Sequence, residues 1–283
     1  MTAISIEEAR GILDSHDLIA IGARADEERQ RRHGKRTTFV RVLEVHVAAV
    51  PIALPSAIGA GEVRVMGQPA SIEAAVAAIT RARSIAGSIP VTAFSLEDLW
   101  TMAGGSEARY RESLHALKRA RLESIAEAAV DMATDPIAAV AAAREAGLLV
   151  PRLTVRDLAA DRGIAHIERA RDIQSSVGGI RAFAPLARVS SVAQPSTGYD
   201  DVKQIAIARL LLENIESIQV DWPLYGPKLA QVALTMGADD IDGVSPLEGD
   251  LGRRRSPIEE IRGNIRAAGL EPIERDGTFA QRT

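Results

Sequence analysis

The sequence predicts an α/β fold, a (β/α) TIM-like barrel that is complete or nearly complete. Three observations lead to this prediction. About eight short runs of apolar and β-branched residues lie between residues 37 and 242, helix signals separate most of them, and no glycine-rich phosphate turn follows any run. Alternating strands and helices imply parallel pairing. Eight such units suit a barrel, and the missing turn disfavours the rival doubly wound sheet.

Residues 1–36 are expected to form a helical leader. Ser5 and Glu8 have the spacing of a capping box, in which each side chain satisfies a backbone N–H at the start of a helix. A second helix is predicted through Leu18, Ile21, Ala25 and Glu28.

Residues 37–243 are expected to form the barrel core. The run "TTFVRVLEVHVAAV" (37–50) is rich in β-branched residues and reads as a long first strand. Further strands are predicted at 62–66, 89–94, 122–126, 148–155, 180–186, 217–222 and 239–242.

Cap signals mark the helices between these strands. Ser71 starts one helix, Asp135 with Pro136 starts another, and Val202 begins an apolar stripe along residues 200–214. Pro227 is expected to open the next helix and Gly237 to close it.

The last segment, 244–283, is predicted to be a C-terminal helix and tail. Ser256, Pro257 and Glu259 supply cap, first-turn proline and capping-box partner, and Gly269 is the stop. No linker or low-complexity tract separates the segments, so 1–283 is expected to be a single domain.

One junction breaks the alternation. The stretch "AVPIALPSAIGAG" (49–61) has two prolines and little room for a helix. A parallel pair needs roughly a dozen residues to return, so this connection is at the lower limit. An irregular, apolar loop is predicted where the pattern calls for a helix.

Composition excludes several classes of protein. The chain of 283 residues carries a formal charge of −4 with a pI near 5.8, which gives no general reason to bind nucleic acid or an anionic membrane. No apolar run reaches the roughly 18 residues of a membrane span, and no signal-peptide pattern opens the chain, so a cytoplasmic protein is expected. There is no cysteine, hence no disulfide, no thiolate nucleophile and no ordinary iron–sulfur or Cys-zinc site.

Several segments together resemble one enzyme family. "DLIAIGARADEERQRRHGKRTTFV" (17–40), "GGIRAFAPLA" (178–187), "IAIARLLLENI" (205–215), "GPKLAQVALTMGADDIDG" (226–243) and "SPIEEIRGNIRAAGLEPIERDGTF" (256–279) are similar to radical S-adenosylmethionine (SAM) enzymes. The family comprises aminofutalosine synthase and dehypoxanthine futalosine cyclase of the futalosine route to menaquinone, with the related F420 precursor synthase subunit. The resemblance covers most of the chain and implies a radical SAM type of barrel with an altered connection between its first two strands.

The motifs of the radical reaction are missing from this resemblance. The family places a Cys-x-x-x-Cys-x-x-Cys loop after its first strand, where this chain has residues 49–61. Of the SAM-binding glycine turn only "MGQP" (66–69) is left, and "ESIAEAAVD" (123–131) has Ala and Glu in place of glycines. A [4Fe–4S] cluster takes thiolate ligands. We therefore expect no cluster, no SAM-dependent radical chemistry and no other cofactor or metal, and no catalytic residue is transferred from the family.

Candidate site residues come from strands whose carboxyl ends would form a barrel active site. Glu44, His46, Arg156 and Asp221 are the catalytic candidates, because a carboxylate–imidazole pair and a nearby arginine suit acid–base work. The alternative for Glu44 and His46 is that they are buried structural ions paired with Arg152 or Arg156.

The candidates for substrate binding are Arg152, Thr154 and Gln219. Arg152 and Arg156 would otherwise pack between the strand and helix layers with their charges reaching solvent. In "GADDIDG", Asp239, Asp240 and Asp242 do not match a calcium loop, and capping or turn formation is expected instead of metal binding.

Three functions remain open. The favoured hypothesis is a cluster-free binding or partner subunit of menaquinone biosynthesis, associated with a cysteine-bearing radical SAM homologue or another pathway enzyme, or holding a small nucleoside. The second is an enzyme with non-redox chemistry, a hydrolase, isomerase or lyase, that uses the barrel pocket in which the resembled family carries out its reaction. The third is a fold without a current ligand.

Overall fold

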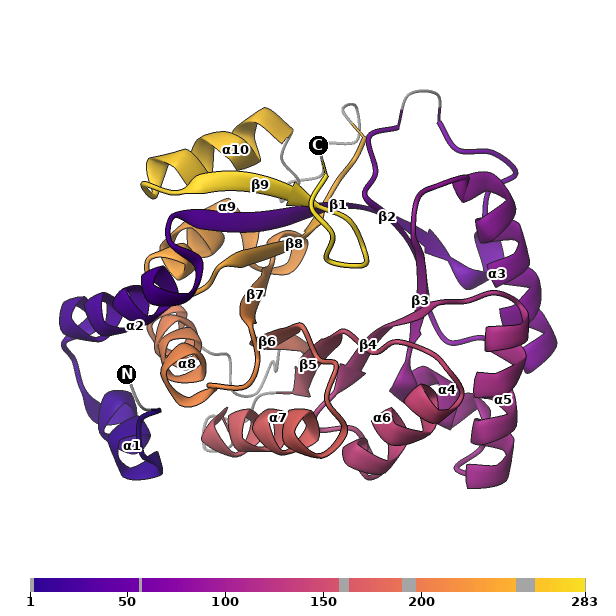
Figure 1. The fold of residues 1–283 in the computed structure, drawn as a ribbon, viewed down its shortest axis with the longest axis horizontal. Helices are drawn as coiled ribbons and strands as arrows, with labels where there is room; N and C mark the ends of the chain where they lie inside the picture. Colours follow the sequence, from indigo (N-terminus) through magenta and orange to yellow (C-terminus); the bar gives the residue numbers. More distant parts are fainter. Residues whose placement is uncertain (1–2, 56–57, 158–162, 190–196, 248–257, 283) are drawn as a thin grey trace.

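The computed structural model describes residues 3–55, 58–157, 163–189, 197–247 and 258–282 as a closed barrel of parallel strands with helices on its outside (Figure 1). The strands are β1 Arg36–His46, β2 Glu62–Met66, β3 Val91–Ser95, β4 Ser124–Ala129, β5 Arg152–Asp157, β6 Ala182–Val189, β7 Ser217–Asp221, β8 Asp240–Val244 and β9 Glu271–Arg275. The helices are α1 Ile6–Asp14, α2 Leu18–His33, α3 Ile72–Ala86, α4 Leu96–Met102, α5 Glu107–Arg119, α6 Pro136–Glu145, α7 Gly163–Val177, α8 Gly198–Leu211, α9 Trp222–Leu234 and α10 Ile258–Ala267.

The first eight strands form the barrel in chain order. Each pairs in parallel with the next, and β1 closes the ring by pairing with β8 through Thr38–Arg41 and with β2 through Val42–His46. The predicted complete TIM-like barrel is therefore confirmed.

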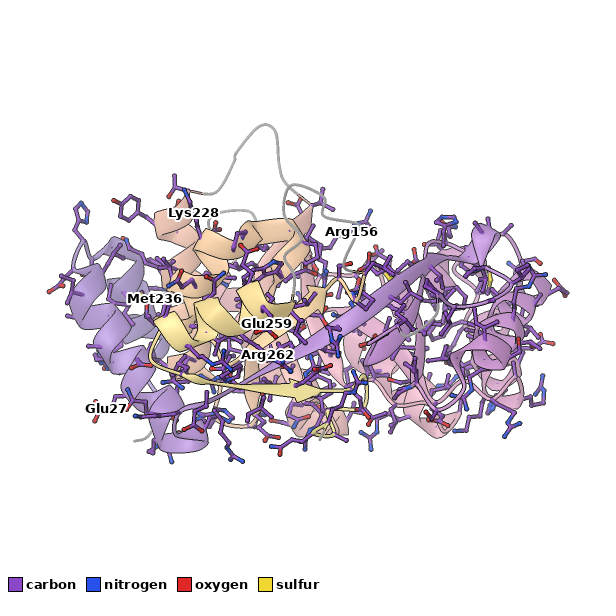
Figure 2. The ribbon with its side chains drawn as sticks, turned by 90° about the horizontal axis from the view of Figure 1, so that it is seen from above. Glu27, Arg156, Lys228, Met236, Glu259 and Arg262 are labelled. Carbon is purple, nitrogen blue, oxygen red and sulfur yellow. The ribbon has the colours of Figure 1, made fainter. Side chains whose placement is uncertain are left out.

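The ninth strand was not predicted. β9 pairs in parallel with residues Arg36–Val40 of β1, along the edge that β2 occupies further up the same strand. It lies next to α10 along β1, as Figure 2 shows. After β9 the tail turns back, and Gln281 forms an antiparallel bridge with Arg275. The C-terminal segment thus completes the lower part of the barrel wall beside β1.

Local sequence signals explain most element boundaries. Ser5 and Glu8 form the capping box of α1, and Asp135 caps α6 with Pro136 in its first turn. The residues Ser256 and Pro257 lie outside the described residues. Apolar side chains fill the layer between strands and helices, among them Phe39, Phe183 and Trp222.

Some boundaries differ from the prediction. β1 ends at His46 instead of residue 50, because the His46 ring accepts the backbone N–H of Ala48 and a short 3-10 turn, Val47–Ala49, follows. The fifth strand starts at Arg152, since Pro151 has no N–H to give to a ladder.

The predicted helix 227–237 also differs. α9 already starts at Trp222, and a non-helical Gly226 with φ of 76° breaks it, so Pro227 opens only its second part. The described residues of the connection from β1 to β2 contain no α-helix, as expected for 49–61. Among the described helices, none has the length and apolar character needed to cross a bilayer.

Candidate functional site

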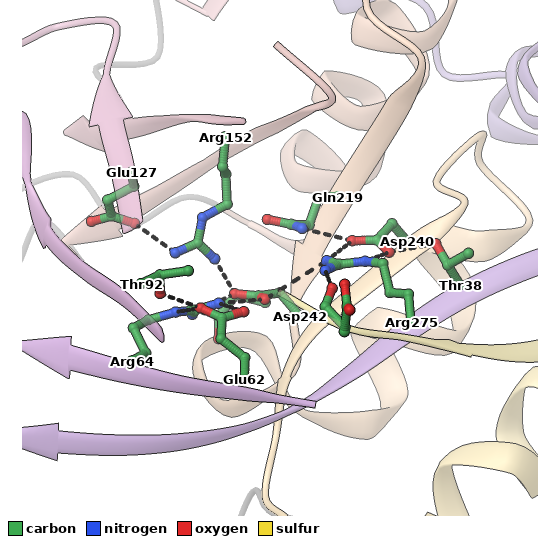
Figure 3. A network of polar contacts seen from close by, with 12 residues as sticks. Thr38, Glu62, Arg64, Thr92, Glu127, Arg152, Gln219, Asp240, Asp242 and Arg275 are labelled. Atoms are coloured by element: carbon green, nitrogen blue, oxygen red, sulfur yellow. Dashed lines mark hydrogen bonds and ion pairs between the residues drawn. The ribbon is translucent and has the colours of Figure 1, made fainter. Parts of the chain in front are cut away.

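Charged side chains fill the inside of the barrel (Figure 3). At the centre, Asp242 of β8 accepts two hydrogen bonds from Arg64 of β2, at 2.8 and 2.9 Å, and a third from Arg152 of β5. Arg64 is held on its other side by Glu62, at 2.7 and 3.0 Å. Arg152 also lies 3.4 Å from the carboxylate of Glu127 on β4. These five residues join four strands across the barrel.

The network continues toward both ends of the barrel. Toward the carboxyl ends of the strands, Arg188 of β6 bridges Glu127 at 3.2 Å and Asp221 of β7 at 2.7 Å. Toward the amino ends, Arg275 of β9 forms a two-pronged ion pair with Asp240 of β8, at 2.7 and 2.6 Å. We call the whole set the barrel ion network; its members are Glu62, Arg64, Glu127, Arg152, Arg188, Asp221, Asp240, Asp242 and Arg275.

Burial makes these charges depend on one another. Burial alone would raise the pKa of Asp242, but the guanidinium groups of Arg152 and Arg64 outweigh it and hold the pKa well below its ordinary value. In the same way, burial of Glu127 is outweighed by Arg188 and Arg152, and its pKa lies below the usual range. Asp242 and Glu127 are therefore ionised at neutral pH.

The barrel ion network leaves almost no free space between the centre of the barrel and the amino ends of its strands. The void between Glu62, Arg152, Gln219 and Phe279 measures only about 10 Å³, roughly the minimum for a single water molecule. A ligand therefore cannot pass down the barrel axis through this void, and larger cavities open at each of the two ends.

A cavity of about 350 Å³ opens at the carboxyl ends of β3 to β6. Such a volume lies within the range of small-molecule sites, and the carboxyl end is where barrel enzymes bind substrates. Its wall includes Ser95, Glu97, Glu127, Thr154, Arg156 and Arg188. Glu97 of α4 and Arg156 of β5 form an ion pair at the rim, and the Arg156 side chain is 56% exposed. Figure 2 labels Arg156.

Thr154 marks this cavity as a place for a polar ligand. The residue is 1% exposed and lines the cavity, yet its hydroxyl makes no hydrogen bond within the described part of the chain. The hydroxyl oxygen opens onto the cavity, so a group bound there can pair with it. A ligand hydroxyl or carbonyl in the cavity would supply that partner.

The structure gathers some of the predicted site residues and separates others. Thr154 and Arg156 line the cavity, and Asp221 lies behind Arg188 while also capping α9 through the N–H of Leu224. Arg152 and Gln219 lie deeper, where Gln219 donates to Asp240 at 2.6 Å. Their predicted binding role stays a prediction.

Glu44 and His46 lie apart from this group. Both side chains are exposed at the end of β1, and the His46 ring lies against Gly67, at the turn after β2. The alternative reading, buried ions paired with Arg152 or Arg156, is wrong because Glu44 and His46 are exposed. The two residues share a face, as the alternation of a strand requires.

The three aspartates of "GADDIDG" are buried anchors of arginine side chains. Asp239 accepts from Arg209 and from the backbone N–H of Ile218, while Asp240 and Asp242 belong to the barrel ion network. The expectation of capping and turn formation was wrong, because these residues enter β8 and point into layers already rich in arginine. No group of side chains able to hold a metal ion is found among the residues described.

Sequence reasoning missed Glu127, Arg188 and Glu97. A signal was present for Glu127, which is the one charged residue in the otherwise apolar and small run "SIAEAA" of β4. A single charge in a buried strand indicates an ion pair or a site. Arg188 gave a weaker signal, near the exposed end of β6.

The comparisons with known proteins agree with this fold. The family described as "CofH/MqnC C-terminal region" matches residues 182–283. An aminodeoxyfutalosine synthase of Thermus thermophilus is 28% identical over 68% of this chain and 60% of its own length. A 5-amino-6-(D-ribitylamino)uracil–L-tyrosine 4-hydroxyphenyl transferase of Haloarcula marismortui is 30% identical over 69% of this chain and 51% of its own length.

The chain is a homologue of these radical SAM enzymes. It spans between 36% and 60% of the length of the first curated relatives it matches. Among solved structures, methylornithine synthase superposes with a TM-score of 0.66 at 11% identity, over 95% of this chain and 94% of its own. The hydrogenase maturase HydG gives 0.63 at 16% identity, over 96% and 72%. At these identities the two structures support the barrel alone.

The side chains present do not fit the iron–sulfur cluster that this family implies. Such clusters are held by Cys thiolates, and the chain contains no cysteine. The described residues between β1 and β2 offer the His46 ring, which already accepts a backbone N–H, and otherwise apolar side chains, proline and glycine.

Proposed function

We propose that this protein is a cluster-free binding or partner subunit of futalosine-pathway menaquinone biosynthesis, acting without radical chemistry. The observation that carries the proposal is a homologue with a complete barrel and no cysteine. Fold and homology support a role in menaquinone biosynthesis. Without thiolates there is no cluster to supply the electron for cleaving SAM.

The cavity at the carboxyl ends of the strands is the proposed binding site. Its polar wall suits a small nucleoside: Thr154 offers an unpartnered hydroxyl, Glu97 a carboxylate that accepts from ligand hydroxyls, and Arg156 a guanidinium at the rim. Glu127 and Arg188 are already paired within the barrel ion network and set the floor of the cavity. The network therefore fixes the shape of the site and leaves Thr154 and the rim pair to meet the ligand.

The test measures ligand binding and partner capture with the full chain. Calorimetry with aminodeoxyfutalosine as probe is expected to show one saturable site. Thr154→Val is expected to raise Kd about three- to tenfold, which is the effect of one lost hydrogen bond. Thr80→Val is the matched control, since its exposed hydroxyl lies on α3 and donates to the Val76 carbonyl. Affinity capture from native cells is expected to recover a cysteine-bearing homologue or another pathway enzyme. Absence of both binding and capture would refute the proposal.

An enzyme with non-redox chemistry is the second candidate, and the Arg156–Glu97 pair beside the cavity favours it. A carboxylate next to an arginine can take a proton from a bound substrate while the arginine holds an anionic group. Turnover of pathway intermediates in air would show this activity. Loss of turnover in Glu97→Gln but not in His46→Ala assigns it to the cavity, and the reverse assigns it to the end of β1.

A further inference from the structure

A second cavity lies at the opposite, amino-terminal end of the barrel and goes beyond the proposed function. It measures about 140 Å³ and is lined by residues from β1, β7, β9 and the segments that precede β6 to β8. The residues that matter here are His33, Arg36, Arg181, Glu216, Ser217 and Arg275. We call it the lower cavity.

The lower cavity carries a positive charge that its own carboxylates do not balance. Glu216 is paired with Arg181 at 3.0 Å, and Asp239 with the buried Arg209. Arg275 is balanced by Asp240, which is fully buried. Both carboxylates that line the lower cavity, Glu216 and Asp239, therefore already have an arginine partner.

Arg36 is the cation left over. It is exposed at the first position of β1, on the same face as Thr38, and no ion pair to it exists among the residues the structure describes. An arginine presents a planar fork of N–H groups that matches carboxylate and phosphate oxygens. The cavity therefore has a guanidinium available to an incoming anion.

Ser217 supplies a second hydrogen-bond donor to the lower cavity. It is 9% exposed and lines the lower cavity from the first position of β7, yet its hydroxyl has no hydrogen-bond partner in the described ranges. The Ser217 hydroxyl and the Arg36 guanidinium line the same cavity, and both have hydrogen-bond donors that no described residue accepts from. His33 lines the same space, with its Nε2 atom 3.0 Å from the Glu216 carbonyl oxygen.

We propose that the lower cavity binds a small oxyanion, a phosphate or carboxylate group, through the Arg36 guanidinium and the Ser217 hydroxyl. Its volume equals that of a few water molecules, each about 30 Å³, so the ligand is a small anion or the anionic end of a larger molecule. The barrel ion network separates the lower cavity from the cavity at the carboxyl ends of β3 to β6. An anion can therefore bind in the lower cavity whether or not the other cavity holds a ligand.

Calorimetry on the full chain tests this inference, with inorganic phosphate and acetate as separate probes at constant ionic strength set with sodium chloride. One saturable site is expected for at least one probe, and the stronger of the two identifies the anion class. Arg36→Ala is expected to raise Kd about tenfold or more, because a charge-assisted contact is lost. Ser217→Ala is expected to raise it about three- to tenfold by the same reasoning.

Two controls make the result decisive. Arg119→Ala removes another exposed arginine, at the end of α5, for which no ion pair is found within the described residues, and is expected to bind as the wild type does. Arg36→Lys keeps the charge without the planar fork and is expected to bind with intermediate affinity. The proposal is overturned if neither anion binds saturably, or if Arg36→Ala and Arg119→Ala bind equally well.

Discussion

The ion pair between Arg275 and Asp240 allows the sharpest prediction about stability. Both residues are almost fully buried, with Arg275 at 2% exposure and Asp240 at 0%. The guanidinium of Arg275 also stacks over the ring of Phe279 at 3.9 Å. Arg275→Met keeps much of the side-chain volume and removes the charge, so Asp240 keeps only the neutral donors Thr38 and Gln219.

The expected cost follows from what the substitution leaves behind. Removing one member of a buried pair destabilises by about 3–5 kcal/mol, because the other charge stays buried without compensation. For a protein of this size that corresponds to a fall in Tm on the order of 10 °C. Adding Asp240→Asn to Arg275→Met removes the stranded charge, and the double variant is expected to recover about 2–3 kcal/mol of the loss.

Thermal and urea unfolding, followed by circular dichroism, is measured for the wild type, Arg275→Met, Asp240→Asn and the double variant, which together form a double-mutant cycle. Arg171→Met is the matched control, since its pairs with Glu168 and Asp172 are partly exposed, at 3.5 and 3.7 Å, and are expected to contribute about 1 kcal/mol or less. If Arg275→Met cost no more than this control, or if the second substitution added to the loss, the reasoning about a stranded carboxylate would be wrong.

Three further predictions follow from other features. Hydrogen bonds from Arg31 and Arg32 lower the pKa of Glu28 from 4.5 to about 2, so the contribution of Glu28 to stability is complete above pH 4.5 and disappears as the pH falls toward 2. The difference in unfolding free energy between wild type and Glu28→Gln should therefore shrink between pH 4.5 and pH 2. A difference that stays constant over this range would contradict the assignment. Gly243 has φ of 76°, and a Cβ at this position would lie 2.8 Å from the Pro223 ring. Gly243→Ala is therefore expected to lower the free energy of unfolding, measured in urea, by about 1–3 kcal/mol. Gly263→Ala lies in a helix with open space around it and should not lower this free energy. Anaerobic reconstitution with iron and sulfide is expected to leave no stoichiometric iron and to yield no 5′-deoxyadenosine from SAM; retention of both elements with product formation would refute the cluster-free proposal.

The barrel could be predicted because its signals are local. Caps such as Ser71 and Asp135, and strands of apolar and β-branched residues, lie within a few positions of the elements that they define. The strand β9 has no such signal. Its sequence "EPIER" holds a proline and three charges, and it becomes a strand only by pairing with Arg36–Val40, more than two hundred positions earlier.

The site could be predicted only in part for the same reason. Thr154 and Arg156 were found because they alternate along one strand whose end faces the cavity. The partners of Arg64 and Arg152 could not be named, since Asp242 is 178 and 90 positions away and meets them only when strand register closes the barrel. A single sequence shows that charges are present in buried strands and leaves their pairing undetermined.

The position of β9 has a consequence for how the chain is made. Residues 36–40 of β1 leave the ribosome more than two hundred residues before the strand that covers their free edge. During synthesis this edge stays open, and its backbone N–H and C=O groups are exposed to pairing with other chains. Nascent chains that pause or stall before residue 271 should therefore recruit chaperones or aggregate through β1.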